Sequence, residues 1–459
     1  MTQQTTSRDG FSSRLGIIAA AAGSAIGLGN IWKFPYITGE YGGAAFILMY
    51  LGCIALIGLP VMLSEFVIGR RAQTNAFGAF KKEAPGTPWF LTGIMGIITA
   101  FIILSFYGVV AGWTLHYIFL AITNSFAGAS ADELGGTFVS FISSPGMPVF
   151  WQGVFMALTV GVVLGGVKNG IERYSKILMP LLLVMLIILA FRAMTVKGAA
   201  EGIAFLFKPD FSKLTMEALM AALGHAFFSL SLGMGAMMTY GSYIGKQENL
   251  GKTAVQVCIA DTAIALIAGL AIFPAVFAFG IEPSAGPGLV FITLPNVFAQ
   301  MAFGQLFAVI FFVLLAVAAL TSAISLMEVV VAYFDEEFGW KRSTSTISVA
   351  VSMTFTGAIL SQGNGAWSGF ELPFLLGGEV ITMNIFDWFI TLTDQLLPLG
   401  GLLVALFIGW QLDRNEIEDE LTNHGKLKLA YLGAYRIVIK FIAPLLIAIV
   451  FLSAIFGIV

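Results

Sequence analysis

Two pairs of glycines stand in the middle of long apolar segments, where they could open the backbone to a ligand. The first pair lies in Gly27-Leu28-Gly29-Asn30 and the second in Gly233-Met234-Gly235. Each glycine costs a helix about 1 kcal/mol relative to alanine, so two within three residues favour an unwound bend, although close helix packing explains either pair alone. Freed N–H groups attract an anion, and freed C=O groups coordinate a hard cation such as sodium. A zwitterionic amino acid fits such a site, with its carboxylate on the N–H side and its ammonium on the C=O side.

The composition indicates a membrane protein that crosses the bilayer many times. Of the 459 residues, 58% are hydrophobic and 11% are charged, whereas soluble domains carry about 25% charged residues. This composition excludes water-soluble enzymes, nucleic-acid-binding proteins and disulfide-rich scaffolds. The net charge of −3 indicates no acidic or basic partner. Cys53 and Cys258 form no CxxC pair, and no Ser/His/Asp, Cys/His or metal cluster is apparent, so we predict neither an enzyme nor a metal-cluster protein.

Eleven apolar runs are long enough to cross a bilayer as helices, which takes about 20 residues each. We predict an all-α integral membrane protein, because lipid offers backbone groups no hydrogen-bonding partner. The predicted spans are residues 14–38, 43–69, 88–124, 149–167, 170–196, 216–244, 252–280, 304–334, 344–362, 381–411 and 429–458. The stretch 282–302 is cut by three prolines, and we interpret it as a re-entrant or lid segment on the outer face.

The distribution of Lys and Arg predicts the orientation in the cell membrane. A cytoplasmic N-terminus would place the loops at 125–148, 281–303 and 363–380 outside the cell, and these loops contain no Lys or Arg. The loop at 193–215 would also lie outside and is an exception, because it holds three lysines. Residues 1–13 are therefore predicted to be a cytoplasmic tail. An odd number of spans then places the C-terminus outside the cell.

The glycine pairs also predict an internal repeat. They lie 206 positions apart, in spans 1 and 6, at matching depth. This pattern is typical of a five-plus-five inverted repeat, in which two discontinuous helices enclose a binding site at the midplane. The first repeat would cover residues 14–196 and the second residues 216–411, and residues 412–459 would add a cytoplasmic loop and an eleventh helix.

The segment Gly27–Tyr36, with the sequence GLGNIWKFPY, resembles the helix 1 signature of the neurotransmitter:sodium symporter family. Further matches are Gly58-Leu59-Pro60 with Glu65 and Gly69-Arg70 in span 2, Tyr107 with Gly112-Trp113 in span 3, the run from Phe227 to Gly233 in span 6, and Leu320-Thr321-Ser322 in span 8. The resemblance extends through span 10. It is closest to the bacterial amino-acid branch, and within it to transporters of multiple hydrophobic amino acids. The sequence departs from the family's common twelve-helix form by ending after helix 11.

The resemblance implies two sodium ions, each held by oxygen ligands. The ligands of the first would be the Ala25 carbonyl, the Asn30 side chain, Ser229, a side chain of helix 7 and the substrate carboxylate. Our candidate in helix 7 is Asp261, because an ionisable group inside an apolar run is expensive and functional by default. Family members often carry Asn near this point.

The second sodium site would join helix 1 to helix 8. The resemblance assigns to it the carbonyls of Gly23, Ile26 and Ala318 and the hydroxyls of Thr321 and Ser322. Hydrogen bonding of these hydroxyls to carbonyls of their own helix is the alternative that the residues alone favour.

The implied substrate site takes an amino acid with an apolar side chain. Its carboxylate would meet the N–H groups of Leu28 and Gly29 and the Tyr107 hydroxyl. Its ammonium would meet the carbonyls of Ala25, Phe228 and Ser229, near the Ser231 hydroxyl. Its side chain would contact Ile103, Phe228, Met234 and Leu326. A charged substrate side chain would be left unpaired in this pocket at high cost. Packing alone is the other explanation for Tyr107 and Met234.

Charges near the ends of the spans are candidates for an outer gate. The resemblance pairs Lys33, just outside the bend of helix 1, with Asp387 early in helix 10. Lys33 could instead reach toward the outer interface as an unpaired cation. Glu65, in span 2, would be a structural acceptor for freed N–H groups of helix 1.

The inner gate would involve the N-terminal tail. Arg8 and Phe11 resemble the family's N-terminal latch, whose acidic partner would be among Asp335, Glu336 and Glu337. A solvated charged tail explains the same residues. In helix 5, Gly170 and Pro180 match a Gly-x9-Pro stretch that the family associates with local unwinding, and a proline kink without motion is the alternative.

These features predict a sodium-coupled symporter that imports hydrophobic L-amino acids, aliphatic and aromatic, by alternating access. Asp261 would supply the negative charge that other members take from chloride, so we predict chloride independence. The same fold with proton coupling, or with a narrow substrate range, remains an alternative. A channel would need repeated pore-lining charges or a carbonyl filter, and the sequence has neither. The oligomeric state is not predicted.

Overall fold

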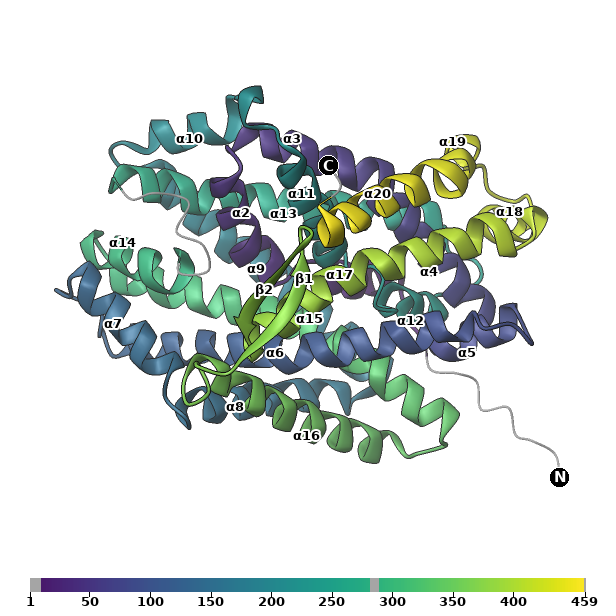
Figure 1. Ribbon diagram of the computed structural model, residues 1–459, viewed down its shortest axis with the longest axis horizontal. Coiled ribbons are helices and arrows are strands. Elements are labelled where there is room, and N and C mark those ends of the chain that lie inside the picture. The colour runs from purple at the N-terminus through teal and green to yellow at the C-terminus, as the bar shows by residue number, and fades with distance from the viewer. Residues whose placement is uncertain (1–9, 281–288, 458–459) are drawn as a thin grey trace.

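The computed structural model describes residues 10–280 and 289–457 as a bundle of long helices (Figure 1). In Figure 1 the long helices α6 (Phe90–Ile122), α16 (Arg342–Ser361) and α17 (Ile385–Leu406) run lengthwise through the molecule. The other α-helices are α1 (Arg14–Ala25), α2 (Phe34–Glu40), α3 (Ala44–Cys53), α4 (Leu59–Ala72), α5 (Ala76–Glu83), α7 (Ala131–Ile142), α8 (Met147–Val163), α9 (Arg173–Met194), α10 (Ala199–Phe207), α11 (Met216–Ser229), α12 (Ala236–Ser242), α13 (Leu250–Ala278), α14 (Leu294–Gln300), α15 (Gly304–Glu337), α18 (Arg414–Thr422), α19 (Leu432–Ile437) and α20 (Ala443–Phe456).

Several long helices contain a short turn of different pitch. The π-helical turns are η1 (Gly29–Lys33), η2 (Ile54–Gly58), η3 (Val167–Glu172), η5 (Leu289–Thr293), η7 (Phe407–Gln411) and η8 (Val438–Ile442), and the 3₁₀ turns are η4 (Phe211–Lys213) and η6 (Gln362–Asn364). Most π turns continue directly into an α-helix, so η2 joins α3 to α4 and η8 joins α19 to α20 within one continuous helix. Such turns are frequent at functional sites.

The helices agree with the predicted all-α protein that crosses a membrane many times. Among the described residues, eight helices are long and apolar enough to cross a membrane, and two bent pairs pass the same test together. One pair is the first predicted span, which bends by 48° between α1 and η1, and the other joins α7 to α8 with a bend of 74°. The sixth predicted span consists of α11 and α12 with a break between them. The predicted breaks in helices 1 and 6 are therefore confirmed.

Helix 1 ends at Ala25 because the backbone becomes extended there. Ile26 has φ −81° and ψ 100°, and the helix resumes as the π turn η1 from Gly29. The missing side chain of Gly27 lets this break approach its neighbours closely. A Cβ atom on Gly27 would lie 2.3 Å from the Ser322 Oγ and 2.9 Å from the Tyr107 hydroxyl oxygen.

Helix 6 breaks where three residues adopt left-handed backbone angles. Ser231, Gly233 and Gly235 have φ of 55°, 79° and 77°, a region that glycine occupies without the strain other residues meet. A Cβ atom on Gly233 would lie only 2.2 Å from the Leu397 carbonyl oxygen. Glycine at 233 is therefore needed both for the turn and for the close contact with α17.

Glu65 serves the break in helix 6, which corrects the prediction that it serves helix 1. Its Oε1 accepts a hydrogen bond from the Gly233 N–H at 2.7 Å, and its Oε2 accepts one from the Met238 N–H at 3.3 Å. The reason lies in packing. A Cβ atom on Gly69 would lie 2.0 Å from the Met238 carbonyl oxygen, so α4 runs against the backbone of α12.

A β-hairpin precedes helix 10 and was not predicted. Strands β1 (Glu371–Leu376) and β2 (Glu379–Asn384) pair antiparallel around a turn at Gly377 and Gly378. The predicted tenth span, 381–411, therefore begins at Ile385 instead. The N–H groups of Gly377 and Gly378 donate to the carbonyls of Ala454 and Ile455 at 2.8 and 2.9 Å, so the hairpin turn closes the end of α20.

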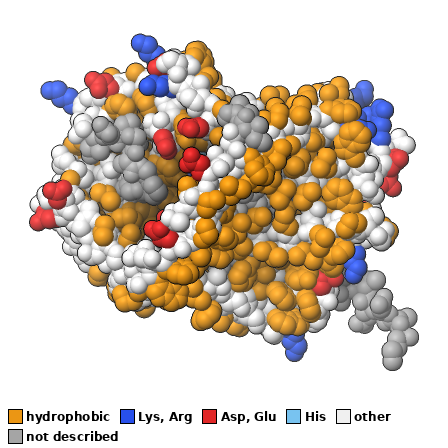
Figure 2. All heavy atoms as spheres, in the orientation of Figure 1, with side chains coloured by type: hydrophobic (Ala, Val, Ile, Leu, Met, Phe, Trp, Pro, Cys, Tyr) orange, Lys and Arg blue, Asp and Glu red, His pale blue; other side chains and the backbone are white. Residues whose placement is uncertain are grey.

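The surface fits a lipid environment. Figure 2 shows hydrophobic side chains spread over a broad area of the face in view, while Lys and Arg lie toward its edges. Phe191 on α9 and Phe355 on α16 are each 68% exposed. Apolar exposure on this scale is uncommon in soluble monomers. The proposed lid at 282–302 lies partly outside the described residues, and its described part forms η5 and the short helix α14.

Candidate functional site

The two helix breaks face each other at a small closed cavity. The Ser231 hydroxyl of helix 6 donates to the Ser24 carbonyl of helix 1 at 2.8 Å, and the Leu28 N–H donates to the Tyr107 hydroxyl at 3.1 Å. The lining residues are Ser24, Ala25, Gly27, Gly29, Ile103, Tyr107, Phe228, Ser229, Ser231, Met234, Ser322 and Leu326. Every residue predicted to bind substrate lines the cavity except Leu28, which contributes its N–H group to the Tyr107 contact.

The cavity is nearly closed in this conformation. Its volume is about 20 Å³, which is room for about one water molecule. The Phe228 ring packs against Gly29, where a Cβ atom would lie 3.1 Å from the ring, and the Lys33 ammonium lies 4.9 Å from the centre of the same ring. A substrate therefore requires the side chains around the cavity to move apart.

Beside the cavity, a buried polar cluster joins helices 1, 6 and 7. The Asn30 amide nitrogen donates to Asp261 Oδ1 at 2.7 Å and to the Ser229 hydroxyl at 3.2 Å. Ser229 in turn donates to Asp261 Oδ1 at 2.8 Å, and the Tyr50 hydroxyl donates to Asp261 Oδ2 at 3.2 Å. The structure thus brings together the side chains predicted for the first sodium site. Tyr50 is a member that the sequence did not indicate.

The groups predicted for the second sodium site also come from two helices, α1 and α15. The Thr321 hydroxyl donates to the carbonyl of Ala318 at 3.0 Å and to that of Ile26 at 3.4 Å. The Ser322 hydroxyl donates to the Ser24 carbonyl at 3.0 Å and lies 3.4 and 3.5 Å from the carbonyl oxygens of Gly23 and Ile26. Hydrogen bonding within α15 therefore explains only part of these contacts, because both hydroxyls also reach the carbonyls freed at the end of α1.

The outer ion pair uses a different acid from the predicted one. The Lys33 ammonium lies 2.9 Å from Asp394 Oδ1, not beside Asp387. Asp387 accepts instead from the Asn384 side chain at 2.8 Å in the first turn of α17. Asp394 follows Asp387 by seven residues, which make about two helical turns, so both acids share one face of α17 and Lys33 meets the one farther along the helix.

The contribution of the Lys33–Asp394 pair to transport can be tested against Asp387 as a matched control. We expect Asp394→Asn to lower the uptake rate severalfold, because it removes the partner of Lys33 above the cavity, whereas Asp387→Asn should leave uptake close to wild type. The Lys33–Asp394 pair is partly exposed, so a modest effect is expected for its loss. Initial uptake rates of a labelled substrate in proteoliposomes measure both variants. A larger defect in Asp387→Asn would contradict the assignment.

On the opposite end, the N-terminal segment packs against the ends of helices. Phe11 donates its N–H to the Tyr243 carbonyl at 3.2 Å, and its ring meets the Tyr240 ring edge-on at 5.7 Å. Arg8 lies outside the described residues. Glu336 accepts from the Thr74 hydroxyl at 2.8 Å and from the Asn75 N–H at 2.7 Å.

Two buried acids at this end were missed by the sequence analysis. Glu172 accepts from the Ser12 N–H at 2.7 Å and from the Ser13 hydroxyl at 2.8 Å, which ties the N-terminal segment to the start of helix 5. Glu328 pairs with Arg342 at 2.5 Å and accepts from the Tyr243 hydroxyl at 2.7 Å. Glu328 interrupts an apolar run, which is the signal that could have found it.

The start of helix 5 is wound and tightly packed. Gly170 lies in the π turn η3, and a Cβ atom there would meet the Val162 carbonyl oxygen at 2.1 Å. Pro180 lies inside the following helix α9. The two residues predicted to form a hinge, Gly170 and Pro180, thus both lie in a continuous helical segment in this structure.

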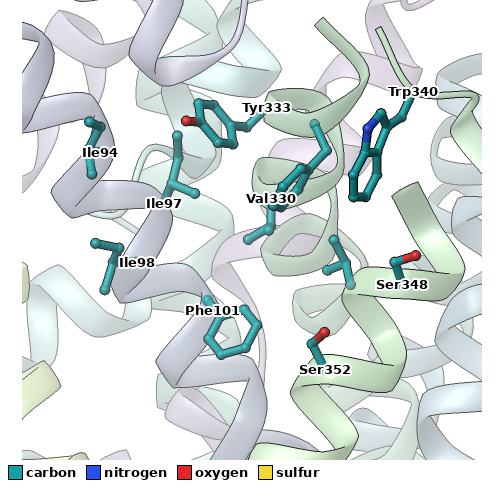
Figure 3. Close-up of a pocket in the computed structure, with 11 residues that line it drawn as sticks. Ile94, Ile97, Ile98, Phe101, Val330, Tyr333, Trp340, Ser348 and Ser352 are labelled. Carbon is teal, nitrogen blue, oxygen red and sulfur yellow. The ribbon is translucent and has the colours of Figure 1, made fainter. Parts of the chain in front are cut away.

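A larger apolar cavity lies away from the helix breaks, between α6, α15 and α16 (Figure 3). Its volume is about 380 Å³. It is lined by Ile94, Ile97, Ile98, Phe101, Val330, Tyr333, Phe334, Trp340, Ser348, Val349 and Ser352. These walls contain no charged side chain and no freed helix end, so they lack the groups that a zwitterion requires.

The geometry of broken helices agrees with comparison to known proteins. The model of the sodium:neurotransmitter symporter family matches residues 8–139 and 137–458. The chain belongs to the sodium:neurotransmitter symporter family. It is therefore a sodium-dependent transporter with many membrane-spanning helices, and not an enzyme.

Relatives and a solved structure cover nearly the whole chain. The uncharacterized sodium-dependent transporter YhdH of Bacillus subtilis is 43% identical over 445 residues, which cover 97% of each chain. An uncharacterized sodium-dependent transporter of Haemophilus influenzae is 36% identical over 473 residues, covering 99% of this chain and 100% of that one. The crystal structure of MhsT in complex with L-phenylalanine superposes with a TM-score of 0.90 at 50% identity, covering 97% of this chain and 100% of that one.

Proposed function

We propose that this symporter couples sodium entry to the import of hydrophobic L-amino acids. The observation that carries the proposal is the cavity between the two helix breaks, whose walls offer freed backbone groups and hydroxyls at one side and apolar side chains at the other. No charged side chain lines it. The likeness to MhsT, whose crystal structure holds L-phenylalanine, supports the same substrate class.

In this proposal the amino-acid core binds to groups that do not read the side chain. The Leu28 and Gly29 N–H groups and the Tyr107 hydroxyl bind the carboxylate, and the Ala25, Phe228 and Ser229 carbonyls bind the ammonium. Leu28 already donates to Tyr107, so the carboxylate would enter between two groups that lie 3.1 Å apart. The remaining wall is apolar, and its flexible member is Met234.

Two sodium ions are proposed to travel with the substrate. At the first site, Asn30, Ser229 and Asp261 already lie within hydrogen-bonding distance of one another. Turning the Asn30 amide over would present its oxygen to an ion beside the Asp261 carboxylate. At the second site the Thr321 and Ser322 hydroxyls meet the carbonyls at the end of α1. Hard oxygen ligands of this kind suit sodium, and the neutral ones cannot carry a proton at neutral pH.

Alternating access is proposed to follow the inverted repeat of residues 14–196 and 216–411. The Lys33–Asp394 pair would close the outer side, and Arg8, Phe11 and Glu336 the inner side. Unwinding at Gly170 and Pro180 would admit water to the second sodium site. The charge pattern supports a cytoplasmic N-terminus, an outside C-terminus and a location in the cell membrane.

Uptake in proteoliposomes tests the coupling ion. We expect a sodium gradient to drive accumulation of labelled leucine, and a proton gradient alone to drive none. Exchanging chloride for gluconate should leave the rate unchanged, because Asp261 supplies a fixed negative charge at the first site. Accumulation on a proton gradient without sodium would refute the sodium-coupled mechanism, and loss of uptake in gluconate would refute chloride independence.

Competition against labelled leucine tests the substrate range. Leucine, isoleucine, methionine, phenylalanine and tryptophan should all compete, because one methylene in an apolar pocket is worth only about 1–3 kcal/mol of discrimination. Aspartate, glutamate, lysine and arginine should not compete, since their side chains would be buried without a partner. Strong inhibition by one amino acid only would show a narrow range, and inhibition by lysine or glutamate would show that the pocket is not apolar.

A further inference from the structure

A third cavity opens where helix 10 ends and helix 11 begins. It has a volume of about 680 Å³ and lies between residues 408–417, at η7 and α18, and residues 433–441, at α19 and η8. We call it the η7–η8 cavity. The helix α18 beside it forms ion pairs with the last turn of α4, through Glu420 with Arg70 and through Glu416 with Arg71. The charge pattern assigns this end of α4 to the cytoplasm. The cavity is therefore separate from the transport site between the helix breaks.

Basic side chains dominate its charge. Arg414, Arg436 and Lys440 line the cavity, against one acid, Asp413. Asp413 is already used as a helix cap, because its side chain accepts from the Asn415 N–H at 2.7 Å. Arg436 pairs with Glu418.

The other two cations that line the cavity are Arg414 and Lys440. Among residues 10–280 and 289–457, neither Arg414 nor Lys440 makes an ion pair. The Lys440 ammonium instead lies over the Trp410 ring, 4.6 Å from its centre.

Lys440 is held in position by its neighbours. It lies in the π turn η8, inside a membrane-spanning helix, and η8 packs against the π turn η7. A Cβ atom on Gly409 would lie 3.0 Å from the Lys440 Cα, and the Trp410 indole donates to the Lys440 carbonyl at 3.1 Å. These contacts hold the Lys440 ammonium at the wall of the cavity.

The rim of the cavity is apolar and accessible. Trp410, Ile437 and Phe441 line it and are 61%, 59% and 55% exposed. Tryptophan and lysine side chains at this position are typical of the boundary between the hydrocarbon core and the head groups. A bound molecule would thus meet cations at one end and exposed aromatic and aliphatic surface at the other.

We propose that the η7–η8 cavity binds an anionic phospholipid, with its phosphodiester between Arg414 and Lys440 and an acyl chain along Trp410 and Phe441. Basic pockets between spans on the cytoplasmic side bind such head groups. A free phosphate would satisfy the cations but would leave the exposed apolar rim uncovered. The bound lipid would lie between the inner end of helix 10 and the final helix of the chain. Asp394 belongs to helix 10 as well, within α17.

Native mass spectrometry of the full-length transporter in detergent tests this inference. The protein is mixed with phosphatidylglycerol, with phosphatidylcholine of the same acyl chains, or with inorganic phosphate. We expect wild type to retain phosphatidylglycerol in preference to phosphatidylcholine. The double variant Arg414→Gln, Lys440→Gln should retain it about tenfold less, because each cation near the head groups contributes to binding.

Two controls keep the test decisive. Lys252→Gln removes an exposed cation of α13 outside the cavity and should bind phosphatidylglycerol like wild type. Arg414→Gln alone changes only an exposed residue at the start of α18. Its retention of phosphatidylglycerol should lie between that of wild type and that of the double variant, and this comparison holds even if Lys440→Gln destabilises the protein. Equal retention of phosphatidylcholine, unchanged binding in the double variant, or displacement of the lipid by inorganic phosphate would each overturn the proposal. None of these results depends on the transported substrate.

Discussion

Transport by the Asp261→Asn variant should require far more sodium than wild type, and chloride should restore part of the loss. In the structure this carboxylate is fully buried and accepts hydrogen bonds from Asn30, Ser229 and Tyr50. Removing one partner of a buried charge pair costs several kcal/mol, and each 1.4 kcal/mol is tenfold in affinity. We therefore expect half-saturation by sodium to rise on the order of a hundredfold in chloride-free buffer.

Sodium titrations of leucine uptake, run in chloride and in gluconate, measure both effects. The variant keeps the size of the side chain and can still accept a hydrogen bond through its amide oxygen, so a folding defect is not the expected outcome. Asp387→Asn is the matched control, because it removes a carboxylate at the start of α17 that touches neither helix break. Unchanged sodium activation in Asp261→Asn would exclude this carboxylate as a sodium ligand.

The features that could be predicted from the sequence are those whose cause is local. The breaks of helices 1 and 6 follow from glycine pairs inside apolar runs, and Asp261 stands out as a charge where charge is costly. The hairpin was open to the same reasoning. Its Gly377-Gly378 turn lies between residues of high strand propensity, a recognised hairpin signal that the apolar count of the tenth span obscured.

Pairings between helices could not be predicted in this way. Whether Lys33 meets Asp387 or Asp394 depends on how far the bend of helix 1 turns its second half, and both acids lie on one face of α17. The sequence is compatible with a Glu65 hydrogen bond to either of the two broken helices. The close contact of Gly69 with the backbone of α12 brings Glu65 to helix 6. Such choices are set by the relative depth of two helices, and no stretch of sequence encodes that depth.

The Gly27→Ala variant should lose transport by roughly a hundredfold while still folding. The added methyl group would lie 2.3 Å from the Ser322 Oγ and 2.9 Å from the Tyr107 hydroxyl oxygen. Either helix 1 would have to move away from α15 and α6, or Ser322 and Tyr107 would have to turn away from the break, and a misplacement of about 1 Å in a positioned site can cost a hundredfold in rate. Both proposed sodium sites include groups at this break, so coupling as well as binding should suffer. Initial uptake rates and binding of labelled leucine measure the loss.

Gly224→Ala supplies the matched control for the same chemical change. This glycine lies in α11, and a Cβ atom there would have no neighbour within 4 Å outside its own helix turn. Alanine is the better helix former by about 1 kcal/mol, so transport should be retained and thermal stability should hold or rise. The contrast between the two glycines separates close approach at the break from a general sensitivity of the bundle to added methyl groups. Wild-type transport in Gly27→Ala would mean that helix 1 can withdraw from Ser322 and Tyr107 without loss, and the contacts that define both proposed sodium sites would then not be required for transport.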